Sequence, residues 1–157
     1  MRHLLAAALI TLLLALPASA NACAQPSNAA ALEQGLIQWV NQQRRSHGLN
    51  ALRPSPKLNA AAQQHGCDMA ARGYFAHQRA GGPKLGDRVK ANGYRFRRVA
   101  ENLAYSRTPK VDVAANLWRG SPSHWATILK PGINDIGVSV TTGGGRIYWV
   151  MNVGTER

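Results

Sequence analysis

The sequence lacks the short motifs that identify many classes of enzyme. It contains no HExxH zinc motif, no GxSxG nucleophile elbow, no Walker loop and no CxxC pair. It also lacks internal repeats and heptads, and beyond its first residues no segment is apolar enough to span a bilayer. Carboxylates are scarce as well: 7 Asp and Glu stand against 19 Lys and Arg, and the formal net charge is +12. These absences point away from a complete zinc protease or nucleophile-elbow hydrolase and towards a strongly basic protein.

The first residues have the composition of a secretory signal peptide. A leucine- and alanine-rich run over residues 4–16 follows Arg2 and precedes two Ala-x-Ala sites, which end at Ala20 and Ala22. The apolar run is too short for a membrane span, and no stop-transfer charges follow it. We therefore expect a signal peptide over residues 1–22, cleaved after Ala20 or Ala22. The protein is then exported, to the periplasm or to the extracellular medium.

Residues 23–157 are expected to form one domain with room for a hydrophobic core, and they contain the only two cysteines. Because an even number of cysteines in an exported chain favours a disulfide, we expect a bond between Cys23 and Cys67. Closing this loop is worth about 4 kcal/mol in the chain-entropy account. Acylation of Cys23 is the alternative. It is disfavoured because Ala20 stands where a lipobox has an aliphatic residue.

Apolar spacing and local start and stop signals predict helices packed on a small sheet. Ser-Pro pairs begin two of the helices, and three consecutive glycines separate the last two alternating segments, which indicates a hairpin. The predicted helices cover Asn28–His47, Ser55–Gly73, Leu85–Ala91, Thr108–Gly120 and Ser121–Pro131, and the predicted strands cover Tyr94–Val99 and the hairpin Ile136–Asn152. Helices that flank a mostly antiparallel sheet define an α+β fold class.

Three histidines and one carboxylate are the candidates for a functional site. His77 follows the second predicted helix, His124 lies in the first turn of a short helix, and Glu101 follows the predicted strand. Spacing alone does not bring these three together. His65 falls on the apolar face of the second helix, so we expect a buried imidazole bonded to the backbone or to a neighbour. Ser121, close to His124, is explained as a helix N-cap rather than as a nucleophile.

Basic residues are densest between positions 84 and 98, where Tyr94 and Phe96 stand among them. We call the following set the basic surface: Lys84, Arg88, Lys90, Arg95, Arg97 and Arg98. Basic residues interleaved with aromatics are typical of nucleic-acid surfaces, but an exported protein rarely meets nucleic acid. An anionic lipid or envelope polysaccharide is the partner class that we favour. The commoner alternative is a solvated cationic face with no specific ligand.

Five blocks of the sequence, taken in order, resemble a known family. They are LNAAAQQHGCDMAARGYFAH, GDRVKANGYRFRRVAENLA, LWRGSPSHWATIL, DIGVSV and YWVMNVG. Their order and spacing resemble the CAP superfamily, which includes cysteine-rich secretory proteins, antigen 5 and pathogenesis-related 1 proteins and is also called the SCP-domain family. The resemblance runs from about residue 41 to residue 154, which is nearly the whole of the expected mature chain. It implies a three-layer α-β-α sandwich around a three- or four-stranded antiparallel sheet.

The resemblance also implies an open cavity lined by His77, Glu101 and His124. Because the two histidines hold a divalent metal in some members of the family, zinc or a similar ion at His77 and His124 is an expectation here. The sequence departs from the usual pattern around the cavity: Trp125 follows the second histidine where Arg is usual, and residues 118–123 contain no carboxylate. Each missing carboxylate weakens the expected metal site.

The resemblance favours a secreted, monomeric binding module for an anionic lipid, a sterol or an envelope polysaccharide. The alternative is a metal-assisted hydrolase, in which Glu101 acts as the general base and His124 polarises a carbonyl. Because no complete zinc or nucleophile motif is present, the non-enzymatic interpretation is preferred.

Overall fold

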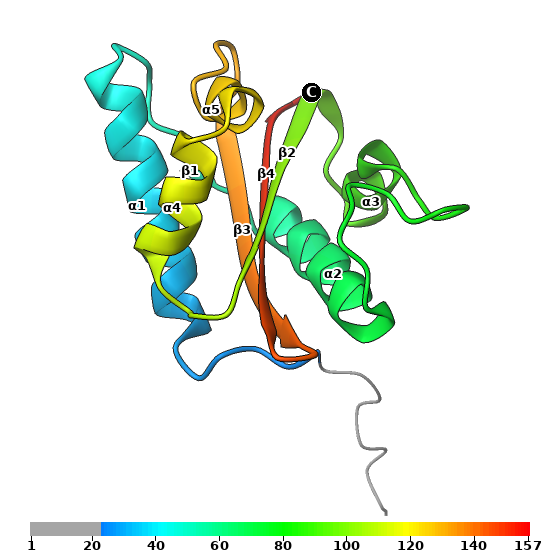
Figure 1. Ribbon diagram of the computed structural model, residues 1–157. Helices are drawn as coiled ribbons and strands as arrows, with labels where there is room; N and C mark the ends of the chain where they lie inside the picture. Colours follow the sequence, from blue (N-terminus) through cyan, green and yellow to red (C-terminus); the bar gives the residue numbers. More distant parts are fainter. Residues whose placement is uncertain (1–22) are drawn as a thin grey trace, which may run out of the picture.

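The computed structural model describes residues 23–157, so the predicted signal peptide over residues 1–22 lies outside the described part. The elements are, in order, α1 (Ala29–Ser46), β1 (Arg53–Pro54), α2 (Pro56–Arg72), α3 (Leu85–Ala91), β2 (Phe96–Ser106), α4 (Val111–Arg119), α5 (Pro122–Ile128), β3 (Asp135–Gly143) and β4 (Arg146–Glu156). Figure 1 shows the sheet between two helical layers, with α1, α4 and α5 on one side and α2 and α3 on the other. The predicted α+β class and three-layer sandwich are confirmed. None of the helices within residues 23–157 is long and apolar enough to cross a membrane.

The sheet is mixed, whereas the resemblance implied an antiparallel one. Its strand order is β1-β3-β4-β2, in which β2 and β3 run antiparallel to the central β4. The two-residue β1 pairs in parallel with the start of β3. The long connection between β1 and β3, which includes α2, provides the crossover that a parallel pair requires.

The strand β2 is longer than predicted. The sequence indicated a strand ending at Val99, but β2 continues to Ser106 and pairs with β4 along this length. Glu101 lies opposite Asn152 in this register, so it stands in the middle of the edge strand rather than after it. Cross-strand pairing overrides the weak local preference of this polar stretch.

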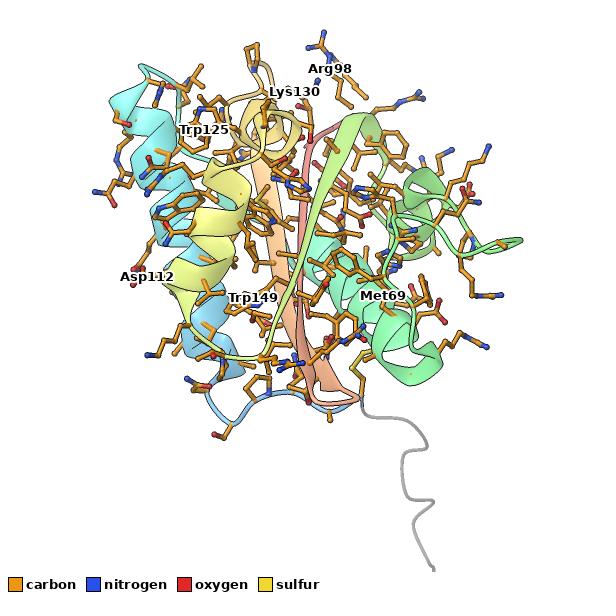
Figure 2. All side chains as sticks on the ribbon, in the orientation of Figure 1. Met69, Arg98, Asp112, Trp125, Lys130 and Trp149 are labelled. Atoms are coloured by element: carbon orange, nitrogen blue, oxygen red, sulfur yellow. A yellow bond between two sulfur atoms is a disulfide. The ribbon has the colours of Figure 1, made fainter. Side chains whose placement is uncertain are left out.

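The core lies on both faces of the sheet, and β4 contributes to both. Trp149 and Met151 belong to the core on the α1 side, whereas Tyr148 and Val150 pack with Met69 of α2. Figure 2 shows Trp149 and Met69 on opposite sides of the sheet. This alternation is the two-residue period of a strand that is buried on both faces. Because a slip of one residue would reverse every side chain, the core also fixes the register of β2 against β4.

The boundaries of α2 follow the predicted signals. The Ser55 hydroxyl accepts a hydrogen bond from the backbone amide of Leu58, and Gly73 ends the helix with a left-handed φ of 68°. The helix packs so closely on β3 that a Cβ at Gly137 would collide with the backbone of α2. This close contact fixes the start of α2 against β3.

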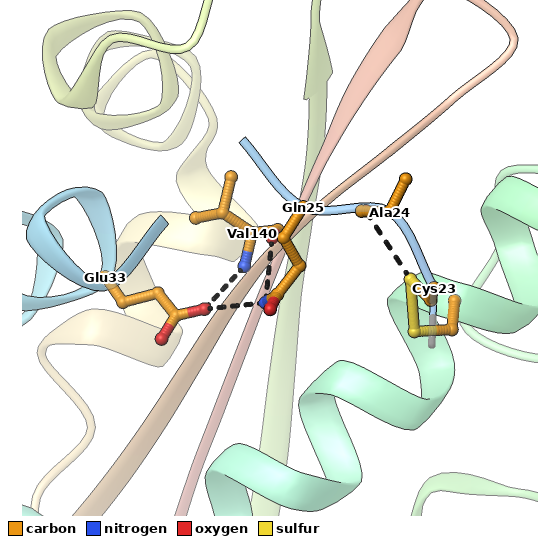
Figure 3. Close-up of a disulfide and its surroundings, with 6 residues drawn as sticks. Cys23, Ala24, Gln25, Glu33 and Val140 are labelled. Carbon is orange, nitrogen blue, oxygen red and sulfur yellow. Dashed lines mark hydrogen bonds between the residues drawn. A yellow bond between two sulfur atoms is a disulfide. The ribbon is translucent and has the colours of Figure 1, made fainter. Parts of the chain in front are cut away.

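A disulfide ties the start of the described chain to α2. Cys23 and Cys67 are bonded with their Cα atoms 5.3 Å apart (Figure 3), which confirms the predicted pairing. Residues 23–25, which we call the N-terminal strap, run beside β3. The backbone amide of Thr142 donates to the carbonyl of Ala24 at 2.8 Å. The disulfide therefore holds the N-terminal strap against the sheet.

Side chains cover more of this edge of β3, which β1 pairs only over its first two residues. The Gln25 amide donates to the carbonyl of Val140 at 3.3 Å, and the Glu33 carboxylate accepts from the amide of Val140 at 3.1 Å (Figure 3). The Asn59 amide donates to the carbonyl of Val138. Backbone groups that an edge strand would leave open are thus paired from within the chain.

Candidate functional site

A buried ion pair lies at the centre of the candidate site. Nη2 of Arg88, on α3, donates to Oε2 of Glu101, on β2, at 2.7 Å, and the two side chains are 3% and 2% exposed. Nη1 of the same guanidinium donates to the backbone carbonyls of His77 at 2.9 Å and Pro83 at 3.1 Å. Arg88 therefore fixes both the carboxylate and the loop that carries His77.

The prediction that Arg88 belongs to the basic surface is wrong. A buried guanidinium needs acceptors for its donors. Glu101 and the two loop carbonyls supply them for Nη2 and Nη1, whereas Nε has no partner within residues 23–157. The other five members, Lys84, Lys90, Arg95, Arg97 and Arg98, are exposed. Sequence analysis missed the role of Arg88, because α3 has only 7 residues and is too short for a periodic signal to mark its inward face.

His77 is held by the same carboxylate. Its Nδ1 lies 2.9 Å from Oε1 of Glu101, while 60% of the side chain is exposed. Because an ionised carboxylate can only accept, Nδ1 carries the proton of this hydrogen bond. With the proton on Nδ1, Nε2 is the ring nitrogen that can offer a lone pair. Glu101 thus sets both the tautomer and the orientation of His77.

His65 has the structural role that its apolar position predicted. The residue is 2% exposed, and Nε2 donates to the backbone carbonyl of Ala76 at 3.0 Å. Burial lowers the pKa of His65, and this effect outweighs the nearby charge of Glu101. The neutral ring therefore packs behind the ion pair and supports the turn before His77.

His124 lies in the first turn of α5, as predicted. Burial, followed by the neighbouring His77, lowers its pKa, so the imidazole is neutral at pH 7. Nδ1 of His124 is buried and has no hydrogen-bond partner within residues 23–157. Ser121 is the N-cap residue of α5, although its hydroxyl makes no capping bond and instead lies 3.2 Å from the hydroxyl of Ser123. No hydrogen bond within the described residues activates either serine towards His124.

The predicted site residues are only partly brought together. His77 and Glu101 are in direct contact, and His77 is near enough to His124 to lower its pKa. In the described part of the chain, however, no group of three or more His, Cys, Asp or Glu side chains is arranged to hold a metal ion. Both oxygens of Glu101 are already engaged, by His77 and by Arg88. A metal at this site would have the two imidazoles as its protein ligands.

An apolar groove opens beside His124. It has a volume of ≈ 440 Å³ and is lined by Phe75, Leu103, Ala104, Tyr105, Leu117, Ser121 and His124. The three large hydrophobic side chains left exposed within residues 23–157 all line it, with Phe75, Tyr105 and Leu117 at 38%, 48% and 49% exposure. Exposed apolar side chains gathered in one hollow are typical of a ligand-binding site.

The two lowered histidine pKa values predict how stability depends on pH. His65 and His124 both titrate below the ordinary value of 6.5 in the folded protein. Below pH 6.5 the unfolded chain therefore binds protons that the folded state resists, and the free energy of unfolding falls as the pH falls. Urea unfolding at pH 7.5 and pH 5.5 measures this change.

A matched pair of variants shows how much of this pH dependence of stability comes from His124. We expect His124→Gln to reduce the loss of stability on acidification, and His47→Gln, at an exposed site on another helix end, to leave it unchanged. Equal stability at the two pH values in the unmodified protein would contradict the prediction.

Comparison with known proteins places the chain in one family. The model of the cysteine-rich secretory protein family, CAP, matches residues 37–153. The Bacillus subtilis protein YkwD is 32% identical over 123 residues, which cover 76% of this chain and 46% of that protein. The chain thus spans less than half the length of this relative.

Two solved structures share the fold. An outer surface protein of Borrelia burgdorferi superposes with a TM-score of 0.77 at 18% identity, covering 86% of this chain and 99% of that one. An extracellular protein of Bacillus anthracis that contains an SCP domain gives 0.72 at 23% identity, covering 82% and 41%. With the family model spanning most of its length, the chain belongs to the cysteine-rich secretory protein (CAP) family.

Proposed function

We propose that this protein is an exported, monomeric, non-enzymatic binding module whose central site holds a divalent metal ion between His77 and His124. The observation that carries the proposal is the chain of contacts from Arg88 to Glu101 to His77, which leaves Nε2 of an exposed imidazole free. The polar site and the apolar groove beside His124 then form one ligand-binding face. The signal-peptide pattern and the extracellular relative from Bacillus anthracis support export.

The donor set fits a divalent ion, but only weakly. Glu101 orients His77 by accepting its Nδ1 proton, which is the usual way in which an outer carboxylate fixes a metal-binding imidazole. His124 is neutral at pH 7 and so has a lone pair to offer. When bound, the ion would supply a positive coordination point for a ligand lying in the groove. Two imidazoles leave the remaining positions to water or to that ligand.

The hydrolase alternative is not favoured by the same contacts. A general base must reach a water or a substrate proton with a free oxygen. Both oxygens of Glu101 accept from His77 and Arg88, and the side chain is only 2% exposed. The charge of Glu101 serves to position its neighbours, so we assign it a positioning role.

Calorimetric titration with Zn²⁺ at neutral pH tests the metal site. We expect a binding heat that disappears in His77→Ala and in His124→Ala, because each variant leaves a single imidazole. His47→Ala is the matched control, since it removes an exposed histidine at the end of α1 and should retain the heat. Glu101→Gln, checked for folding, should weaken binding by about 10–100-fold. The same heat before and after His77→Ala would end the proposal.

The exposed part of the basic surface supports an anionic partner. Lys84, Lys90 and three arginines form no ion pair within residues 23–157 and stand near α3 and the start of β2. The positive potential of these side chains attracts anionic lipid or envelope polysaccharide, and salt screens this attraction. A sterol would instead use the apolar groove. These partner classes belong to the proposal.

A further inference from the structure

A hollow in the basic surface lies apart from the histidine site. It is formed where α3 ends, where β2 begins and where the last residue passes beside them, and its volume is ≈ 610 Å³. Its lining consists of Lys90, Arg95, Phe96, Arg97 and Arg157. Four of these five side chains are cationic, and no Asp or Glu side chain of the described residues is among them. We call it the Phe96 groove.

Four of the seven Asp and Glu side chains are engaged in ion pairs elsewhere. Ion pairs within residues 23–157 join Asp68 to Arg72 and Arg79, Asp135 to Arg53, Glu101 to Arg88 and Glu156 to Lys57. Even Glu156, which is adjacent in sequence to Arg157, is directed to Lys57 rather than into the Phe96 groove. Cations that lack an internal partner keep their attraction for an external anion.

Part of the Phe96 groove is held in place before any ligand arrives. The backbone amide of Arg157 donates to the carbonyl of Arg95 at 2.8 Å, and its Nε donates to the carbonyl of Phe96 at 3.1 Å. The Lys90 ammonium stands 5.5 Å from the centre of the Phe96 ring. Because Nε takes the internal contact, the two terminal nitrogens of the Arg157 guanidinium are left for a ligand.

The shape and the donors together identify a class of ligand. Guanidinium groups bind phosphoryl oxygens in pairs, and one phosphoryl group can bridge two cations. A hollow lined by four cations suits a chain that carries several phosphoryl groups, because different pairs of cations can bind successive groups. We propose that the Phe96 groove binds a linear, soluble polyanion that carries repeated phosphoryl groups. This inference rests on the proposed binding-module function but not on the metal site.

Two charge-matched triple variants test the groove. Lys90→Glu/Arg95→Glu/Arg97→Glu reverses three groove cations, and Arg45→Glu/Arg107→Glu/Lys110→Glu reverses three exposed cations on α1 and on the segment leading to α4. Both triples change the net charge equally. Calorimetry with linear polyphosphate of defined length, in buffer with EDTA, measures binding. We expect the groove triple to lose about 100-fold in affinity and the control triple less than about fivefold.

The outcomes separate this inference from its rivals. Equal losses in the two triples would show a response to net charge alone and overturn the groove. Binding of the unmodified protein to anionic phospholipid vesicles but not to polyphosphate would assign the surface to a membrane instead. Tighter binding to a thymidine oligonucleotide than to polyphosphate of equal charge would assign it to nucleic acid. If the groove triple fails to fold by circular dichroism, the neutral triple Lys90→Gln/Arg95→Gln/Arg97→Gln replaces it.

The proposal of a metal site and the proposal of a polyanion groove can be contradicted independently. His77→Ala should retain polyphosphate binding, and the groove triple should retain the Zn²⁺ heat. If the unmodified protein gives the Zn²⁺ heat but does not bind polyphosphate, only the groove proposal is overturned. An absent Zn²⁺ heat with intact polyphosphate binding would overturn the metal site alone.

Discussion

Replacing Arg88 with alanine is expected to lower the free energy of unfolding by about 3–5 kcal/mol. The substitution leaves the Glu101 carboxylate in a position where its side chain is 2% exposed and no longer has a cation beside it. The carbonyls of His77 and Pro83 lose their donor at the same time. Urea unfolding at neutral pH, followed by circular dichroism, measures the loss.

Two comparisons show that the effect comes from the buried charge. Arg95→Ala, in the same basic segment but exposed, should change stability by no more than about 0.5 kcal/mol. Arg88→Met/Glu101→Gln, which removes both charges, should recover most of the loss because no buried charge is left unpaired. A loss below about 1 kcal/mol in Arg88→Ala would contradict the buried ion pair.

Removing the disulfide is the second large expected effect. The double variant Cys23→Ser/Cys67→Ser should lose about 4 kcal/mol of unfolding free energy, because a loop with a sequence separation of 44 is no longer closed in the unfolded state. The N-terminal strap also loses its covalent anchor to α2. Urea unfolding of the variant and of the oxidised protein gives the difference.

Reduction provides an independent control for the disulfide. A thiol reductant should lower the stability of the unmodified protein to that of the double variant, and it should leave the double variant unchanged. Equal stability of the variant and the oxidised protein would show that the bond contributes nothing to the folded state.

The helices were predictable because their signals are local. Ser55 and Gly73 bound α2 by capping and by left-handed backbone geometry, and both effects depend on residues within one turn. The length of β2 was not predictable in this way. Its second half contains polar residues, and only pairing with β4 makes it a strand.

The candidate site was also predictable only in part. The resemblance to the CAP family indicated His77, Glu101 and His124, and the structure brings the first two into direct contact. The local sequence did not indicate that Arg88 is buried. Arg88 is one of several basic residues in its segment, and the sequence around it would be the same whether its side chain faced water or Glu101. What distinguishes it is the packing of α3 against β2, and that is a property of the assembled fold.

The paired edge of β3 bears on how this protein avoids pairing with a second copy of itself. Sheet extension by a second copy would need the same backbone groups of Val138, Val140 and Thr142 that side chains and the N-terminal strap now occupy. Without the disulfide the N-terminal strap loses its tether to α2, and the hydrogen bond between Thr142 and Ala24 is left to hold it against the sheet. The bond between Cys23 and Cys67 therefore helps to keep this edge of β3 paired within the chain, in addition to stabilising the fold.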